Sequence, residues 1–140
     1  MRILGIDYGE KRIGLALSDP LGFTAQGLKT LHRQNKEQVL RDLAVLCREN
    51  GVGEAVIGLP INMDGSVGPK AKEVLDLIPK MEAVLKIPVK AWDERLTSKQ
   101  AGRLMIEEGL SRQKQRSNSD RLASMLILQS YLESKRARSN

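Results

Sequence analysis

The chain has 140 residues, 41% hydrophobic and 29% charged, which is the size and composition of one globular domain. No segment approaches the ~18 apolar residues that a membrane span needs, which excludes a membrane-spanning protein. The single cysteine, Cys47, excludes a fold held together by internal disulfides. Because the sequence also lacks the pattern of a secretion signal, we expect a cytoplasmic location. The net charge of +6 lies entirely in residues 95–140, which hold 10 Lys/Arg against 4 Asp/Glu, and this asymmetry favours a polyanionic partner such as nucleic acid.

The first predicted element is a β-hairpin. Two apolar runs, residues 2–8 and 12–18, are joined by the short turn 9–11, and both have strand character. Residues 23–31 alternate weakly between apolar and polar side chains, which predicts a third strand at the edge of the sheet. The chain is therefore expected to begin with three antiparallel strands.

A helix and a strand follow these three strands. Apolar side chains at helical spacing continue to about Asn50, and Asn35 is a suitable N-cap, with Gln38 three residues later as in a capping box. Cys47 lies on the apolar side of this helix, which indicates a buried thiol and not a nucleophile. Residues 54–59 are apolar after the first residue and predict a short buried strand.

The next predicted helix begins after the loop 60–68, where Pro69 suits the first helical turn. Pro79 should break or kink this helix near its middle, because proline lacks a backbone donor and clashes with the preceding turn. Residues 87–92 then predict another short strand.

Two further helices are predicted in the last third of the chain. Thr97 and Gln100 form a capping-box pattern, and the helix that they begin ends near Gly109. The polar and basic residues 111–118 predict a loop. A final helix is expected over residues 120–133, where apolar side chains recur at helical spacing.

This order of elements predicts an α/β fold with a mixed five-stranded sheet. The first three strands are antiparallel, the later strands are parallel, and helices cover both faces. Residues 1–134 are expected to form this single domain, and residues 135–140 a basic tail.

Asp7 lies within an otherwise apolar strand, where a carboxylate is costly unless it is paired or bound to a metal ion. A salt bridge to Lys11 or Arg12, or a cap on the turn at Gly9, is the structural alternative. The glycines around Asp7 would let a ligand come close. An Asp-x-Gly sequence followed by a second strand presents phosphate to metal ions in several phosphoryl-transfer folds.

Two adjacent acids, Asp93 and Glu94, directly follow a predicted parallel strand. Ligands of open α/β sheets bind outside such strand ends. The alternative is structural: Arg95 neutralises the acids, or they complement the dipole of the helix that follows. Because side chains alternate along a strand, only one acid should face Asp7, and we favour Glu94, with Asp93 as the alternative.

Asp120 stands at the start of the final predicted helix, where an acid stabilises any helix through its dipole. Together with Asp7 and Glu94, however, it forms a set of carboxylates that a mixed sheet can bring to one rim. Carboxylates bind Mg²⁺ or Mn²⁺, and two such ions ~3.5–4 Å apart can clamp a phosphodiester. We therefore predict Asp7, Glu94 and Asp120 as metal ligands, and these three with Asp93 as the catalytic residues.

Polar and basic residues near these acids form the candidate substrate-binding set. The loop after residues 54–59 offers either a tight turn or hydrogen bonds to phosphate. The basic loop 111–118 could lead a phosphate backbone toward the metal ions. Residues of the first hairpin turn and Arg95, which follows the two adjacent acids, complete the set. Its members are Gly9, Lys11, Arg12, Asn62, Asp64, Gly65, Ser66, Arg95, Arg112, Lys114 and Arg116.

Four stretches of the sequence together form a specific pattern. They are GIDYGEKRIGLALSD at 5–19, GLPINMDGS at 58–66, WDERLTS at 92–98 and DRLASMLILQSYL at 120–132. In content and order they resemble the YqgF family, also called RuvX, whose members are described as Holliday-junction-resolvase-like proteins or candidate pre-16S ribosomal RNA nucleases. The resemblance covers nearly the whole chain and implies an RNase H-like fold.

The resemblance also implies that Asp7, the two acids after the last strand and Asp120 carry metal and catalysis. Two positions depart from the family pattern. Ser124 stands where a second alanine is common, and Pro79 interrupts a helix that usually contains alanine and charged residues. The change at Ser124 is small and should not abolish the site, and Pro79 should alter the local shape but not the chemistry.

The expected function is metal-dependent hydrolysis of phosphodiester bonds during processing of the 5′ end of pre-16S ribosomal RNA. The first alternative is a Holliday junction resolvase, which must cut two symmetric strands and would act as a homodimer. A sugar-kinase or actin-like ATP-binding domain needs a second domain, for which 140 residues leave no room. A non-catalytic nucleic-acid-binding module is the alternative of another class.

The aromatic content limits how the substrate can be recognised. One Trp, two Tyr and one Phe leave little surface on which bases could stack, so we expect contacts to the backbone and its shape. The expected partners are a ribosomal RNA precursor or branched DNA, and a ribosomal component that presents the RNA. The expected oligomeric state is a monomer or a homodimer.

Overall fold

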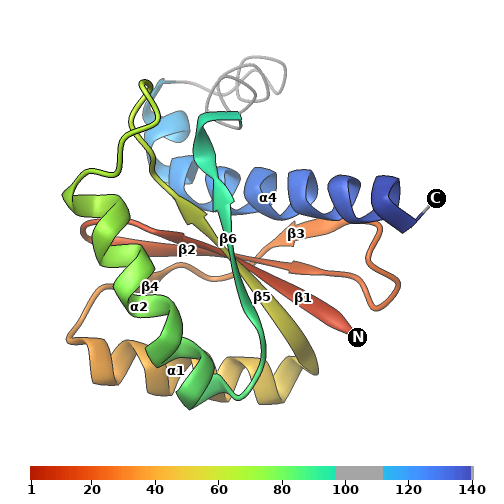
Figure 1. Ribbon diagram of the computed structural model, residues 1–140. Helices are drawn as coiled ribbons and strands as arrows, with labels where there is room; N and C mark the ends of the chain where they lie inside the picture. The colour runs from red at the N-terminus through yellow and green to blue at the C-terminus, as the bar shows by residue number, and fades with distance from the viewer. Residues whose placement is uncertain (97–111, 140) are drawn as a thin grey trace.

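A mixed β-sheet forms the centre of the molecule, with helices on both of its faces (Figure 1). The computed structural model describes the backbone of residues 1–96 and 112–139 and the side chains of residues 1–95 and 121–138. Within this part of the chain the strand order is β3-β2-β1-β5-β6, and a further short strand, β4, also pairs with β2. The described helices include none that is long and apolar enough to cross a membrane.

The central strands change from antiparallel to parallel pairing, as predicted. β1 (Arg2–Tyr8) and β2 (Arg12–Ser18) form the antiparallel hairpin. β1 pairs on its other side with β5 (Val52–Leu59) in parallel, and β5 pairs in parallel with β6 (Val89–Asp93). The carboxyl ends of β1, β5 and β6 therefore meet at one end of the sheet.

The third predicted strand, residues 23–31, is in fact two short strands. β3 (Ala25–Gly27) pairs with the last residues of β2, and β4 (Leu31–His32) pairs with its first residues. Among the described residues the sheet thus has six strands, where five were predicted. The weak alternation of this edge segment explains the difference, because a strand with few buried side chains has little to hold one continuous register.

Helices α1 (Lys36–Asn50) and α2 (Pro69–Leu85) cover one face of the sheet (Figure 1). Asn35 caps α1 as predicted, because its side chain accepts a hydrogen bond from the backbone N–H of Gln38 at 2.8 Å. The second half of the capping box is absent, since the Gln38 amide donates forward to Asp42 at 2.8 Å.

Pro79 does not interrupt α2, contrary to the prediction of a break. The helix is continuous from Pro69 to Leu85. Val74 before the proline and Met81 after it are 2% and 0% exposed, so both halves are fixed in the core. This packing holds the helix across the one backbone hydrogen bond that proline removes.

Helix α4 (Arg112–Ser139) lies along the other face of the sheet (Figure 1). The prediction of a loop over residues 111–118 is wrong, because the helix already begins at Arg112. Asp120 consequently lies in the third turn of the helix and not in its first. Residues 135–139 of the predicted basic tail continue the same helix. The helix predicted over 97–109 lies outside the described residues.

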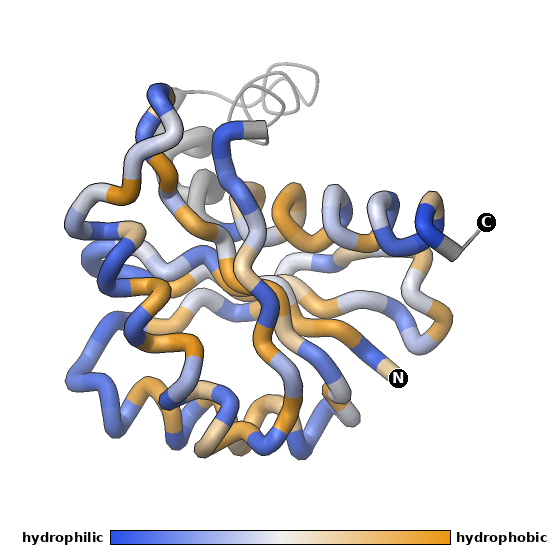
Figure 2. Tube along the Cα trace, in the orientation of Figure 1, coloured by the Kyte–Doolittle hydropathy of each residue, from blue (hydrophilic) through white to orange (hydrophobic). Residues whose placement is uncertain are grey.

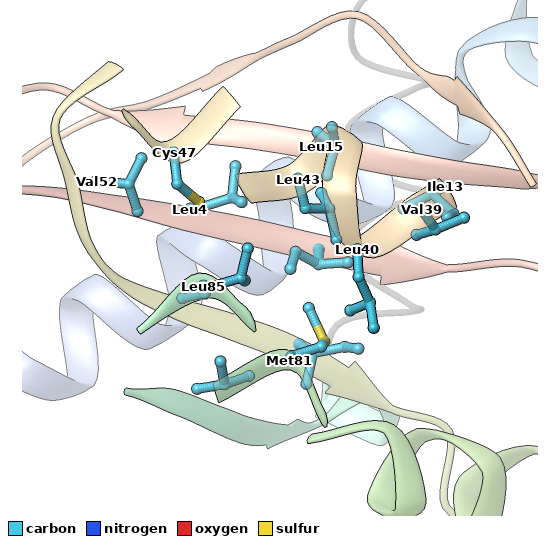
Figure 3. Close-up of a cluster of buried hydrophobic side chains, with 14 of the residues drawn as sticks. Leu4, Ile13, Leu15, Val39, Leu40, Leu43, Cys47, Val52, Met81 and Leu85 are labelled. Carbon is cyan, nitrogen blue, oxygen red and sulfur yellow. The ribbon is translucent and has the colours of Figure 1, made fainter. Parts of the chain in front are cut away.

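Each face of the sheet has its own apolar core. The larger core lies under α1 and α2 and includes Leu4, Leu43 and Met81 (Figure 3). The smaller one lies under α4 and includes Val56 and Ile127. Cys47 is buried in the larger core, and burial raises the pKa of its thiol to about 11. The surroundings of Cys47 therefore agree with the prediction of a buried, unreactive thiol.

Small residues let α4 lie close to β1. A Cβ atom on Gly5 would be 2.7 Å from the Cβ atom of Leu128 and 2.9 Å from the backbone oxygen of Ser124. Ser124 is fully buried, and its hydroxyl donates to the backbone oxygen of Arg121 at 2.7 Å. The small side chain of Ser124 therefore fits the close approach of α4 to β1.

Candidate active site

The carboxyl ends of β1 and β6 bring Asp7 and Glu94 together. Asp7 lies near the end of β1, and Glu94 begins the 3₁₀ turn η1 (Glu94–Leu96) directly after β6. A hydrogen bond joins their two carboxyl groups. The two acids therefore lie close enough for each to influence the ionisation of the other.

Burial has the largest influence on the charge of Glu94. It raises the pKa of Glu94, the hydrogen bond with Asp7 lowers it, and the negative charge of Asp93 raises it again. The net result is a pKa above the ordinary value for glutamate. A nearby cation would reverse this balance, because it stabilises the charged form.

Gly58 on β5 provides the space that the Glu94 side chain occupies. A Cβ atom on Gly58 would be 2.7 Å from the Glu94 Cδ and Oε1 atoms and 2.6 Å from the Cδ1 atom of Ile127. Any larger residue would therefore displace the carboxylate or the Ile127 side chain. The sequence showed Gly58 only as the start of a motif, because a contact between neighbouring strands has no local signature.

Asp93 is bound by Arg95. The Arg95 guanidinium contacts the Asp93 carboxylate with Nη2 at 2.7 Å and Nε at 3.0 Å, and the Arg95 backbone N–H donates to it at 2.9 Å. These hydrogen bonds lower the pKa of Asp93 and raise that of Arg95. The geometry thus assigns Glu94, and not Asp93, to the pair with Asp7, and Asp93 shapes the turn.

Helix α4 runs from the carboxyl end of the parallel strands toward their amino end. The Ile127 side chain packs beside Gly58 near the end of β5. Tyr131, one helical turn later, contacts Glu54 near the start of the same strand. The backbone at Asp120 therefore lies toward the end of the sheet that carries Asp7. The Asp120 side chain is outside the described set, and among the described side chains no group of three or more His, Cys, Asp or Glu could hold a metal ion.

A pocket of about 180 Å³ opens beside the acidic pair. Besides Asp7 and Glu94, its walls include two cations, Arg33 and Lys70. The Lys70 ammonium lies 2.6 Å from the carboxylate of Glu10, and both side chains are largely exposed. The site therefore combines partly buried acids with cations that could contact a phosphate backbone.

Arg33 connects three parts of this pocket. Its guanidinium donates to the backbone oxygen of Gly9 at 3.1 Å, forms an ion pair with Glu73 of α2 at 2.8 Å and lies 4.4 Å from the centre of the Tyr8 ring. It thereby fixes the chain that follows Asp7. Sequence reasoning missed Arg33, because its partners are distant in the chain and no motif contains it.

The predicted phosphate-binding loop is hydrogen-bonded within itself. Ser66 donates to the Asp64 carboxylate through its hydroxyl at 2.6 Å and its backbone N–H at 2.9 Å, and Asn62 donates to the Ser66 hydroxyl at 3.0 Å. Gly65 has a φ of 88°, which confirms the predicted turn. A Cβ atom on Gly65 would be 3.6 Å from Arg95 Nη1, so this loop lies beside the turn after β6.

The remaining predicted binding residues fall into two groups. Lys11 and Arg12 are exposed at the hairpin turn, and glycine is required at position 9 because the Cβ atom of any other residue would be 2.5 Å from the Arg12 backbone oxygen. The other three lie in the first turns of α4, with side chains outside the described set: Arg112, Lys114 and Arg116.

Comparison with known proteins identifies the family. The model described as "RuvX: Holliday junction resolvase" matches residues 1–134. The chain belongs to the RuvX family. Relatives named "Putative pre-16S rRNA nuclease" occur in Syntrophomonas wolfei, at 49% identity over 95% of this chain and 94% of that one, and in Clostridium acetobutylicum, at 48% over 96% and 99%. A Moorella thermoacetica relative of the same name is 50% identical over 95% of both chains.

Solved structures share the fold of this RuvX protein. The Thermus thermophilus RuvC in complex with a Holliday junction matches with a TM-score of 0.62 and 16% identity, over 96% of this chain and 95% of that one. The fowlpox virus Holliday junction resolvase matches with a TM-score of 0.59 and 14% identity, over 96% and 99%. At these identities the likeness shows the fold, which is RNase H-like, as the sequence resemblance implied.

Proposed function

We propose that this RuvX protein is a metal-dependent nuclease that hydrolyses phosphodiester bonds in processing the 5′ end of pre-16S ribosomal RNA. The observation that carries the proposal is the pair of Asp7 and Glu94, two carboxyl groups joined by a hydrogen bond beside a pocket at the end of the sheet. Membership of the family supports cleavage of nucleic acid. The names of relatives near 50% identity support RNA as the substrate.

The chemistry of these residues fits a divalent cation. Two adjacent carboxylates repel each other when both are ionised, and a cation with a preference for oxygen ligands relieves this repulsion. Asp7, Glu94 and Asp120 would hold Mg²⁺ or Mn²⁺, and we propose two ions. When bound, such ions supply Lewis acidity to the phosphodiester and lower the pKa of water.

The other residues of the site act by positioning. The ion pair of Asp93 with Arg95 holds the turn that carries Glu94. Arg33 holds the chain after Asp7 through the Gly9 backbone oxygen. The exposed cations around the pocket would bind successive phosphates of the substrate and so bring the scissile bond to the acids.

Cleavage of two defined substrates tests the proposal. A fragment that contains the pre-16S 5′ end and a four-way DNA junction are each incubated with the protein in Mg²⁺, in Mn²⁺ and in EDTA. We expect metal-dependent cuts in the RNA that Asp7→Asn abolishes and that Asp76→Asn, a change of an exposed acid on α2, leaves intact. Absence of RNA hydrolysis with both metal ions would contradict the proposal.

A Holliday junction resolvase is the second candidate, and the description of the matching family favours it. Paired, symmetric cuts in the four-way junction by a protein that is dimeric in analytical ultracentrifugation would support it. A non-catalytic module would instead bind RNA equally well as wild type and as Asp7→Asn, and neither protein would cut.

A further inference from the structure

An exposed ion pair stands beside the acids of the candidate active site. The Lys70 ammonium lies 2.6 Å from Oε1 of Glu10, and both side chains line the same pocket as Asp7 and Glu94. Glu10 belongs to the turn between β1 and β2, whereas Lys70 belongs to the first turn of α2 (Figure 1). Figure 2 shows the hydrophilic hairpin turn beside the start of this helix. The pair therefore joins two segments that border the site.

The position of Lys70 is unfavourable for the helix that carries it. The N-terminal end of a helix is the positive end of its dipole, so it attracts an acid and repels a lysine. The first turn of α2 contains no acid, and the N-cap residue Gly68 provides no side-chain hydrogen bond. Helix stability therefore does not explain a lysine at this position. A negatively charged group beside it does, because that group meets both the ammonium and the positive end of the helix.

Glu10 supplies that negative charge in the structure, but its hold on Lys70 is weak. The side chains of Lys70 and Glu10 are 69% and 70% exposed, and water screens an ion pair that is so open. The hydrogen bond with Lys70 is the largest of the influences that lower the pKa of Glu10, so the carboxylate is charged. Its charge repels a phosphate that enters the same pocket. A phosphodiester can therefore replace Glu10 at Lys70 at little cost to the fold.

Arg33, the other cation in the described lining of this pocket, is less available to a ligand. Its ion pair with Glu73 is 2.8 Å long between side chains that are only 21% and 36% exposed. It also donates to the backbone oxygen of Gly9 at 3.1 Å. Release of Arg33 would remove both contacts and the support of the chain after Asp7. Of the two cations, Lys70 is therefore the one whose partner can be exchanged.

We propose that Lys70 binds a backbone phosphate next to the scissile one, and that Glu10 holds Lys70 until this phosphate replaces it. The inference rests on the proposed nuclease function, because the acidic pair defines where the scissile phosphate lies. The two phosphates are close together, since Lys70 and the acids line one pocket of about 180 Å³. The exchange gives the two partners opposite effects: Lys70 strengthens substrate binding and Glu10 weakens it. An ion pair that only supports the fold would give both partners the same effect.

Equilibrium binding without cleavage tests this exchange. The RNA fragment and the DNA junction of the cleavage test are labelled with a fluorophore and titrated with protein in EDTA, and fluorescence anisotropy gives the Kd. Lys70→Gln should bind about two- to fivefold more weakly, the range of an exposed ion pair. Glu10→Gln should bind more tightly by a similar factor. The controls Lys80→Gln and Glu49→Gln, which change exposed residues of α2 and α1 outside the pocket, should bind like wild type.

Salt dependence and a double variant sharpen the test. Lys70→Gln should flatten the slope of log K against log salt by about 0.7, the value of one phosphate contact on a single strand. In the Lys70→Gln background, Glu10→Gln should raise the affinity less than it does in wild type, because most of the gain comes from release of Lys70. An equal gain in both backgrounds would mean that Glu10 only repels the nucleic acid, which would overturn the exchange. Circular dichroism confirms that each variant is folded.

Steady-state cleavage separates this inference from the proposed function. In Mg²⁺, Lys70→Gln should raise KM and leave kcat near that of wild type, because it removes a contact to a phosphate that does not react. A protein that shows the binding effects in EDTA but never cleaves would refute the nuclease and still support the phosphate contact. Conversely, wild-type affinity in Lys70→Gln, or weakened binding in Glu10→Gln, would overturn the exchange even if the protein cleaves RNA. Wild type that binds neither the RNA nor the junction would also overturn it.

Discussion

Each end of the sheet holds a carboxylate that is at least partly buried, Glu54 at one end and Glu94 at the other, but their neighbours differ. At the amino end, Glu54 is 6% exposed and accepts hydrogen bonds from the Tyr131 hydroxyl at 2.7 Å and the Lys135 ammonium at 3.1 Å. At the carboxyl end, Glu94 meets another acid, Asp7, and its pKa is raised. A buried acid that faces donors and a cation supports the fold, whereas one that faces an acid needs a proton or a metal ion. Burial alone therefore does not identify an active-site acid.

The largest effect is expected from removal of the charge at the carboxyl end. Glu94→Gln should lower kcat by about 10²–10³-fold or more, as loss of one electrostatic group from an active site does. The free energy of unfolding should stay the same or rise, because the charge of a partly buried acid beside another acid is removed. Cleavage assays and urea unfolding measure the two effects. A variant with wild-type kcat would exclude Glu94 from the site.

A smaller loss of activity should follow when Glu94 is displaced but not removed. Gly58→Ala should lower kcat by about 10–100-fold, because misplacement of a reacting group by about 1 Å is costly. Its control is Gly51→Ala, which lies after α1 at a φ of 64° with open space around its Cβ position. That change should destabilise the fold through backbone strain and leave kcat unchanged. Equal kcat values for both variants would refute the role of Gly58.

The opposite pattern is expected at the amino end of the sheet. Glu54→Gln should lower the free energy of unfolding by roughly 1–3 kcal/mol, the range for hydrogen bonds to charged groups, because it weakens the contacts with Tyr131 and Lys135. Its kcat should equal that of wild type. Glu49→Gln, at an exposed position of α1, is the matched control and should change neither quantity. Lost activity in folded Glu54→Gln would remove the distinction between the two ends.

The smallest effect is a pH dependence that also originates at the amino end. Burial, with the hydrogen bond to Glu54 and its charge, raises the pKa of Tyr131 from 10.0 to about 12. Because the folded pKa is the higher one, this contribution to stability is complete below pH 10 and is lost as the pH rises toward 12. Tyr131→Phe should remove this part of the alkaline destabilisation. Unfolding curves between these pH values, compared with wild type, would show whether it does.

The elements that the sequence predicted best are those with continuous local patterns. The apolar runs of β1 and β2, the cap at Asn35 and the turn at Gly65 each depend on neighbouring residues, and all four agree with the structure. The start of α4 was missed for the same reason: residues 112–118 are polar and basic and lack apolar spacing, so nothing local distinguishes a helix from a loop.

The candidate site was predictable only in part. A carboxylate inside an apolar strand indicated Asp7, and side-chain alternation favoured Glu94 over its neighbour. The residues that support them were not predictable, because Arg33 and Gly58 act on groups that only the folded sheet brings near. The contact between Glu54 and Lys135 spans most of the chain and has no sequence pattern.

The position of α4 in the chain has a consequence for the protein during its synthesis. Translation produces β1, β2 and β5 before the helix that covers them. The side chains of Ile3 and Val56 on that face therefore stay uncovered until Ile127 of α4 packs against them. Until α4 docks, Asp120 is also missing from the proposed metal site. If the proposed function is correct, the chain would gain activity only after α4 has been synthesised and has packed on the sheet.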